Sequence, residues 1–211
     1  MSRPSIGQVF SKGIQATLNN YGVLIVNNLL MATAIFLSAI TVIGIILIPS
    51  ITGGYQESLI RICRGEAVRM GDFFKKGFNK FGSLLGAAIL YILGISIGCI
   101  LLLIPGIYLM IAWYFAILLI VDQKFNCKIS ETFGKSRNII HGIAGWWHTS
   151  LFIGIIVLIY LAIEIILFVL ELFISPVVGI IFRILVFLTI YPFFGVIVVS
   201  FYNDTVSKEF Q

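Results

Sequence analysis

Residues 81–121, FGSLLGAAILYILGISIGCILLLIPGIYLMIAWYFAILLIV, contain no Asp, Glu, Lys or Arg. One membrane-spanning helix needs about 20 mostly apolar residues, so this stretch is long enough for two. Pro105-Gly106 lies inside it and predicts the turn between them, because Pro suits the first turn of a helix. Residues 13–56 are also free of charge, and residues 142–203 form a third, mostly apolar block that Ser175-Pro176 interrupts. These blocks predict an all-α membrane protein whose helices cross in pairs.

The composition excludes several other classes. Of the 211 residues, 60% are hydrophobic and 11% are charged, against roughly 25% charged in a typical soluble domain. A soluble globule and a disordered chain are therefore excluded. Cys63, Cys99 and Cys127 have no metal-ligand spacing and are expected to be free thiols that pack, not a disulfide scaffold. Residues 1–13 lack the apolar core of a signal peptide, so the first apolar block is expected to be retained.

The positions of the charges predict the topology. Basic residues cluster at the two ends of the chain, Arg3 and Lys208 included, and between the apolar blocks. The positive-inside rule places such segments in the cytoplasm, which requires each block to cross twice. A five-span alternative would put a strongly basic segment outside, and we reject it. The six expected spans are residues 20–40, 44–63, 82–102, 105–121, 144–171 and 177–202, with both termini on the cytoplasmic side of a prokaryotic inner membrane.

Three short segments repeat one pattern: VFSKG at 9–13, FFKKG at 73–77 and TFGKS at 132–136. Each has Phe, one residue, Lys and a small residue, and each precedes an apolar block. Each also has an apolar face and a basic face at the helical period, which is typical of a helix lying in the membrane interface. We therefore expect one polytopic domain, residues 1–211, with internal units at about 4–64, 70–121 and 127–203. Each unit is an amphipathic cytoplasmic helix followed by a hairpin.

Aromatic and basic side chains are expected at the interface itself. Anionic lipid headgroups attract juxtamembrane basic residues by about 1 kcal/mol each, so the bilayer is the expected partner and nucleic acid is not. Two tryptophans between His141 and His148 favour an aromatic belt over a metal site, because the signature of a zinc-binding helix is absent. The expected interfacial residues are Phe10, Lys12, Phe74, Lys76, Phe133, Lys135, Trp146 and Trp147.

Several of these motifs resemble one family. They are Pro49 to Gly53 running on to Arg64-Gly65, GDFFKKGF at 71–78, Pro105-Gly106-Ile107, and Lys135-Ser136-Arg137 before a Gly and a Trp pair. The chain is similar over nearly its whole length to poorly characterised prokaryotic six-helix membrane proteins related to the membrane domain of glycerophosphoryl diester phosphodiesterases. The soluble phosphodiesterase domain of those enzymes is absent here. The resemblance therefore implies a fold and a membrane location, but no reaction.

Three charged residues lie within the last apolar block. Glu164 and Arg183 are each about ten residues from a turn near residue 174, hence at equal depth of about 15 Å, and they are expected to pair. Glu171 lies one heptad beyond Glu164 on a similar face. We favour an ion pair that fixes the register of the last two helices. A polar step in a substrate or proton path and a contact with lipid headgroups stay open as alternatives.

Other polar or helix-breaking residues interrupt the spans. Asn27 and Asn28 are expected to form hydrogen bonds between helices, in preference to binding a ligand. Pro49, Gly53 and Gly54 predict either a kinked, partly unwound second span, as at transporter sites, or close packing through small residues, which we favour. Pro192 predicts a kink in the last span.

No catalytic motif and no metal-binding or cofactor-binding pattern is recognisable. A nucleophile elbow, a P-loop and a dinucleotide fingerprint are all missing from the sequence. We therefore expect a non-catalytic membrane protein without a cofactor, which scaffolds a partner or organises lipids. The partner is either another membrane protein or a second copy of the chain. The alternative is a small transporter or channel with a site near the kinked second and sixth spans.

Overall fold

The computed structural model describes residues 5–125 and 127–206, with the backbone alone at Val42. These residues form helices and turns without a β-strand, so the predicted all-α class is confirmed. Arg3 and Lys208, which contributed to the predicted topology, lie outside the described residues. The helices are α1 (Ile6–Asn19), α2 (Tyr21–Ala39), α3 (Val42–Cys63), α4 (Asp72–Asn79), α5 (Phe81–Leu101), α6 (Leu103–Ala112), α7 (Ala116–Val121), α8 (Ile129–Ile139), a π-helical turn (Ile140–Ala144), α9 (Trp146–Phe173) and α10 (Pro176–Val206).

Five helical segments are long and apolar enough to cross a membrane: α2, α5, Leu103–Val121 (α6 with α7), α9 and α10. Length and composition thus support a membrane protein. α3 is not among the five, because Thr52, Gln56 and Glu57 make its second half polar. The predicted count of six crossings therefore stays a prediction. The helix ends lie within a few residues of the expected spans.

Tight turns join consecutive apolar helices. α2 packs against α3, α5 against α6, and α9 against α10. The turn between α5 and α6 lies at Leu102, three residues before the predicted Pro105-Gly106, and Pro105 falls in the first turn of α6. Gly106 lies so close to Gly98 that a Cβ on Gly98 would come within 3.0 Å of the Gly106 backbone. Small residues thus bring the two helices together directly after the turn.

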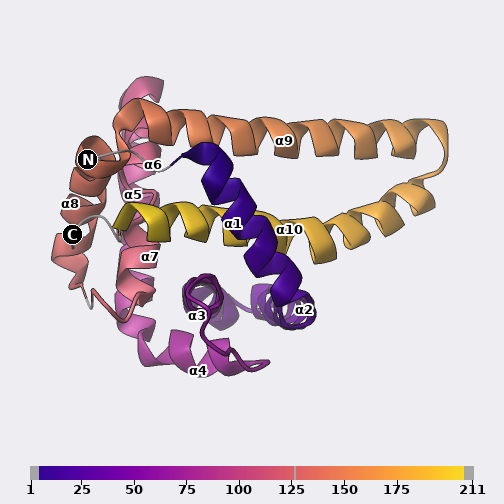
Figure 1. Ribbon diagram of the computed structural model, residues 1–211, viewed down its shortest axis with the longest axis horizontal. Helices are drawn as coiled ribbons and strands as arrows, with labels where there is room; N and C mark the ends of the chain where they lie inside the picture. Colours follow the sequence, from indigo (N-terminus) through magenta and orange to yellow (C-terminus); the bar gives the residue numbers. More distant parts are fainter. Residues whose placement is uncertain (1–4, 126, 207–211) are drawn as a thin grey trace.

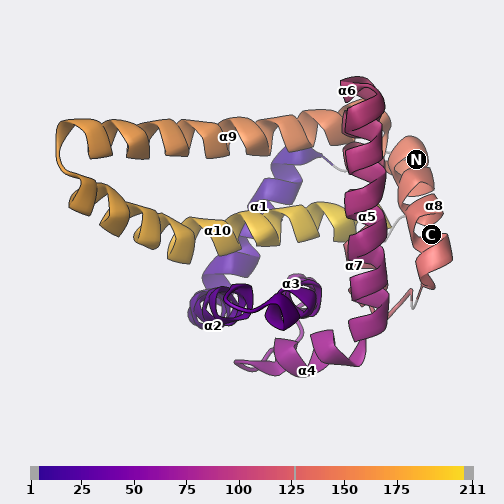
Figure 2. The ribbon, with the colours of Figure 1, turned by 180° about the vertical axis from the view of Figure 1, so that it is seen from behind.

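The three helix pairs run in three different directions from a common centre. In Figures 1 and 2 α9 and α10 extend sideways to a distant turn, α5 and α6 run vertically, and α2 and α3 lie along the line of sight. α1, α4 and α8 lie across the regions where the pairs converge. The pairs are covered to different extents, because 44% of the most apolar window of Leu103–Val121 is buried, against 17% for α5. In α9 only 6% of the most apolar window is buried.

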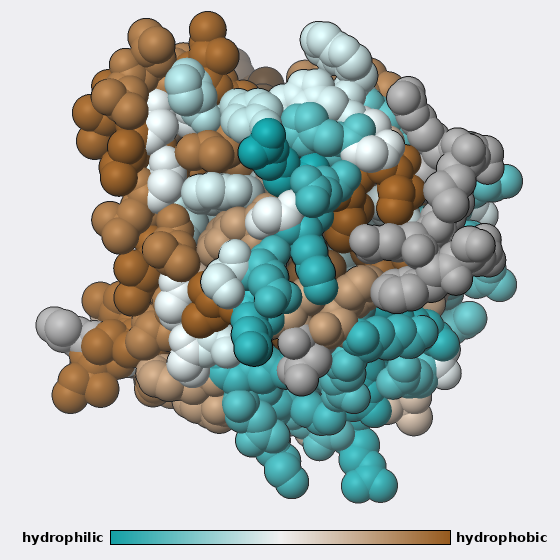
Figure 3. Space-filling model, turned by 90° about the vertical axis from the view of Figure 1, so that its left-hand side faces the viewer, coloured by the Kyte–Doolittle hydropathy of each residue, from teal (hydrophilic) through white to brown (hydrophobic). Residues whose placement is uncertain are grey.

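The core is the region of convergence. Its largest fully buried side chains include Leu59 of α3, Phe115, Phe152 of α9, and Phe201 and Tyr202 of α10. The Phe152 and Phe201 rings stack with their centroids 4.2 Å apart. Figure 3 shows the side that carries α8, where hydrophilic residues form a continuous band and apolar ones gather along one edge. The polar surface and the uncovered apolar surface are therefore separated in space.

Candidate functional site

The three short amphipathic helices have corresponding environments. Val9, Phe73 and Thr132, which occupy the same position of the repeated segment, are all fully buried. Four residues further along each segment, a small residue lies close to a neighbouring helix. A Cβ on Gly13 would clash with Ile197 of α10, and a Cβ on Gly77 with the Ser50 carbonyl of α3. The third small residue, Ser136, donates from Oγ to the Ala112 carbonyl at 2.9 Å and accepts from the Phe115 N–H at 3.2 Å.

These contacts follow a cyclic order. α4 packs against α3, α8 against α7, and α1, from the first unit, against α10 of the last unit. Each short helix therefore lies on the second apolar helix of the unit before it, and α1 closes the ring. The three short helices thus share one kind of environment, and the threefold repeat stays a prediction.

The ends of the three second helices meet in a polar junction, which we call the hub (Arg64, Asp122 and Tyr202). Arg64 follows α3, Asp122 follows α7, and Tyr202 lies near the end of α10. The Arg64 guanidinium donates to both oxygens of Asp122, at 2.8 and 2.5 Å. The Tyr202 hydroxyl donates to Asp122 Oδ2 at 2.9 Å. One carboxylate therefore joins all three units.

The electrostatics of the hub are unusual because Asp122 is 0% exposed and follows the C-terminus of α7. Burial raises the pKa of Asp122, but hydrogen bonds from Arg64, the Lys124 N–H and Tyr202 outweigh burial and leave the pKa below its usual value. The negative end of the helix dipole also disfavours a carboxylate at this place. Lys80 offsets that field, because its Nζ donates to the Ile120 carbonyl at 2.7 Å. The hub thus holds an ionised, fully paired carboxylate.

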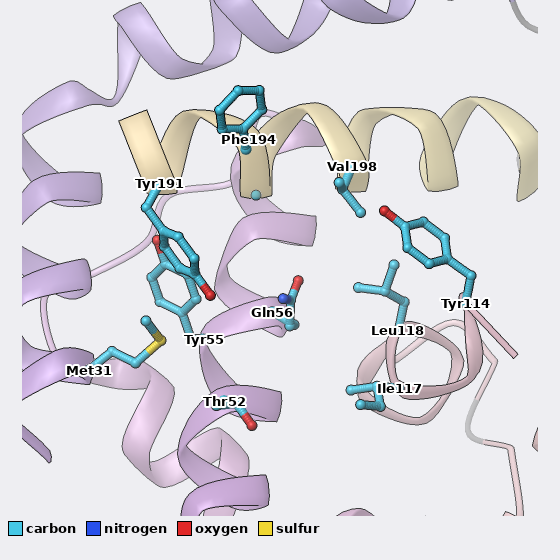
Figure 4. Close-up of a pocket in the computed structure, with 11 residues that line it drawn as sticks. Met31, Thr52, Tyr55, Gln56, Tyr114, Ile117, Leu118, Tyr191, Phe194 and Val198 are labelled. Carbon is cyan, nitrogen blue, oxygen red and sulfur yellow. The ribbon is translucent and has the colours of Figure 1, made fainter. Parts of the chain in front are cut away.

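A cavity of ≈ 340 Å³, the central cavity, lies beside the hub between α2, α3, α7 and α10. Figure 4 shows Tyr55 and Tyr191 on one side, Tyr114 on the opposite side and Gln56 between them. Neither an acidic nor a basic side chain lines it. The Tyr55 hydroxyl is buried and has no hydrogen-bond partner within the described residues. The lining residues are Met31, Thr52, Tyr55, Gln56, Tyr114, Ile117, Leu118, Tyr191, Phe194, Gly195 and Val198.

The three charged residues of the last apolar block form an ion cluster (Glu164, Glu171 and Arg183). Arg183 Nη1 lies 2.7 Å from Glu164 Oε2, and Nη2 lies 3.1 Å from Glu171 Oε2. The pairing of Glu164 with Arg183 is thus as predicted, and Glu171 joins it. A second cavity of ≈ 310 Å³, the side cavity, opens between α9 and α10 and has Glu164 and Arg183 in its wall.

The two asparagines of α2 link this helix to its neighbours. Asn27 is buried, and its Oδ1 accepts from the Gly71 N–H at 2.9 Å. Asn28 is also buried, and its Nδ2 donates to the Phe187 carbonyl at 2.9 Å. Asn28 thus makes the hydrogen bond between helices that we expected, whereas Asn27 bonds to the loop directly before α4.

The helix-breaking residues leave the helices continuous. α3 runs through Pro49 and α10 through Pro192, and α10 bends along its length (Figure 1). A Cβ on Gly53 would lie 2.6 Å from Leu84, and one on Gly54 would overlap the Phe73 carbonyl. Of the two alternatives for this region, the structure therefore has close packing through small residues.

The predicted interfacial residues make contacts mostly within the chain. Lys12 Nζ lies 2.7 Å from Asp204 Oδ1, and Lys76 Nζ lies 3.9 Å from Glu57 Oε1. Lys135 Nζ lies 3.6 Å from the Cys127 sulfur. The rings pack on neighbouring aromatics: Phe10 on Phe152, Phe74 on Phe73, Phe133 on Trp113 and Trp146 on Tyr108, whereas Trp147 is 82% exposed.

Metal chemistry finds no support in the described residues, where no three His, Cys, Asp or Glu side chains gather in a way that would hold an ion. His141 instead contacts the Arg137 carbonyl through Nδ1 at 2.9 Å. Comparisons with protein-family models, with curated proteins and with solved structures found no match. The resemblance to the membrane domain of glycerophosphoryl diester phosphodiesterases therefore stays a prediction.

Sequence reasoning missed both the hub and the central cavity. Asp122 directly ends an uncharged block, which is typical of a charge at the membrane surface and not of a buried residue. The useful signal lies in the repeat, because Arg64, Asp122 and Tyr202 all fall near the ends of the second helices of the three units. For the cavity, nothing separates its tyrosines from other aromatic residues in the apolar blocks.

Proposed function

We propose that the protein is a non-catalytic, polytopic membrane protein that organises lipid around three divergent hairpins. Each hairpin crosses the membrane twice, and the hub and the short helices lie at the cytoplasmic side of a prokaryotic inner membrane. The observation that carries this proposal is the exposure of α9: only 6% of its most apolar window is buried, although one face of the helix packs against α10. In a bilayer lipid or another protein must cover such a surface.

Helix length supports strong tilting of this hairpin. α9 has 28 residues and α10 has 31, so at 1.5 Å per residue each is about 40 Å or more long. The hydrocarbon core is about 30 Å thick, and a longer helix is accommodated by tilting. A last hairpin that tilts away from the hub leaves room for lipid between itself and the rest of the chain. Basic residues of the short helices and of the loop after α3 would contact anionic headgroups on the hub side.

The experiment measures what covers α9. With the three native cysteines replaced by Ala, Leu158→Cys, at an exposed position of α9, and Phe152→Cys, at a buried one, each receive an environment-sensitive fluorophore. The labelled protein is reconstituted with brominated phosphatidylcholine. We expect strong quenching at position 158 and weak quenching at position 152. Weak quenching at both positions, with a disulfide forming between two Leu158→Cys chains, would show that a second copy of the chain covers α9 in place of lipid. That result would overturn the proposal.

A small transporter or channel is the second candidate, and the central cavity is the observation that favours it. The cavity lies between α3 and α10, the expected second and sixth spans, and Thr52 and Gln56 contribute polar groups to it. Transport requires the cavity to open alternately to the two sides. Accessibility of a Gln56→Cys variant to impermeant thiol reagents, applied in turn from each side of sealed vesicles, tests this. Reaction from both sides supports a transporter, and reaction from one side alone contradicts it.

A further inference from the structure

We propose that the central cavity and the side cavity form one binding site for a hydrophobic organic cation, with the apolar body of the ligand among aromatic rings and its charge beside the ion cluster. The two cavities adjoin, because Tyr191 and Phe194 of α10 line both. Their volumes of ≈ 340 and ≈ 310 Å³ each fall in the range of small-molecule sites. The inference goes beyond lipid organisation and does not depend on it.

Aromatic rings and a few polar groups make the central cavity suitable for an organic ligand. Thr52 and Gln56 supply polar side chains to its lining, and Tyr55 supplies a ring. Tyr114 and Tyr191 also line this space (Figure 4), and each presents a hydroxyl and a ring face.

The charge balance selects a cation. Arg183 is bonded to both Glu164 and Glu171, so two carboxylates share one guanidinium and the ion cluster has one negative charge in excess. No basic side chain other than Arg183 lines either cavity. An anion would therefore meet a guanidinium that is already paired twice. A cation beside the ion cluster gains both from the excess charge and from the rings of Tyr160 and Tyr191, which line the side cavity, through cation–π attraction.

The apolar remainder of the lining selects a hydrophobic body. Ile117, Leu118 and Val198 line the central cavity, and Leu167 and Val186 line the side cavity. A small, strongly hydrated cation would lose its water there without compensation. An organic cation with aromatic or alkyl groups around its charge carries no tightly held water and fills this space.

The test uses two ions of the same shape and opposite charge, tetraphenylphosphonium and tetraphenylborate, with the full chain in a non-ionic detergent. Equilibrium dialysis should show saturable binding of tetraphenylphosphonium with about one ion per chain. Tetraphenylborate should show only the unsaturable uptake of empty micelles. Saturable binding of both ions to the same extent, or of neither, would overturn the proposal.

Two variants locate the site. Glu171→Gln removes the excess negative charge and should weaken tetraphenylphosphonium binding at least about tenfold. Its matched control is Glu66→Gln, which makes the same charge change in the loop after α3. Tyr191→Leu removes one of the two rings that line both cavities, at an exposed and therefore tolerant position, and it should weaken binding several-fold. Its control is Tyr21→Leu at the start of α2. Circular dichroism verifies that each variant is folded, and unchanged affinity in both folded site variants would refute the assignment.

Discussion

The hub leads to its most specific prediction for a variant that removes the charge of Asp122. In the Asp122→Asn variant the carboxylate that joins the three units is lost, and Arg64, whose side chain is 17% exposed, stays charged without its partner. Breaking a buried pair by removing one partner costs about 3–5 kcal/mol, because an uncompensated charge is left behind. The bonds that the hydroxyl of Tyr202 and the N–H of Lys124 donate to Asp122 are also weakened. We therefore expect a loss of about 4 kcal/mol in the free energy of unfolding.

The assay is reversible unfolding in mixed micelles titrated with sodium dodecyl sulfate, followed by circular dichroism. A double-mutant cycle with Arg64→Gln isolates the pair, because the double variant leaves no charge unpaired and should recover at least about 2 kcal/mol. The control is the pair of Arg61 and Glu66, where the Glu66 side chain is 49% exposed and Glu66→Gln should cost about 1 kcal/mol or less. An Asp122→Asn loss no larger than that of the control, or a cycle without coupling, would refute the description of the hub as a buried, three-way junction.

Three further outcomes follow from particular contacts. Gly54→Ala should destabilise the protein by about 2 kcal/mol or more, because the new Cβ meets the carbonyl of Phe73. Gly134→Ala, with open space around it, should stabilise α8 by about 0.5–1 kcal/mol. The same unfolding titration measures both variants, and equal effects would contradict the close packing at Gly54. Because the pKa of Asp122 is lower in the folded protein than in the unfolded chain, its contribution to stability is present above about pH 4 and is lost as the pH falls through the folded value. The difference in the free energy of unfolding between the wild type and Asp122→Asn should therefore shrink below about pH 4, and a difference that does not change with pH would contradict this. Glu164→Gln should reduce accumulation in membranes, as immunoblots would show, and normal accumulation with loss of a transport phenotype would instead assign the ion cluster to function.

The sequence predicted the elements well, for physical reasons. Apolar block length and the distribution of charge depend only on the requirement that backbone and charged groups avoid hydrocarbon, so the ends of α2, α5 and α9 fall close to the expected spans. The short helices were also predictable, because the 3.6-residue period of α1, α4 and α8 separates an apolar from a basic face. The pairing of Glu164 with Arg183 was also predictable, because the two residues are equally far from the turn between their helices.

The relative placement of these elements was not predictable. Nothing in a single apolar block specifies which other block it contacts, so the packing of α1 on α10 and the divergence of the three helix pairs appear only in three dimensions (Figure 1). Asp122 illustrates the same limit, because its partner Arg64 lies 58 residues earlier in the chain. The central cavity forms where faces of several helices converge, and no local sequence pattern indicates which faces do so.

The most direct test of the account is the sidedness of the three hairpin turns. In a cysteine-free background, single cysteines replace Thr41, Leu102 and Ile174 at the turns and Ala67 in the loop before α4, and intact cells receive a membrane-impermeant maleimide. Three double crossings with the hub in the cytoplasm predict labelling at 41, 102 and 174 from outside, and labelling at 67 only after lysis. Reaction at 67 in intact cells, or protection of any one turn until lysis, would contradict the arrangement of three hairpins around a cytoplasmic hub.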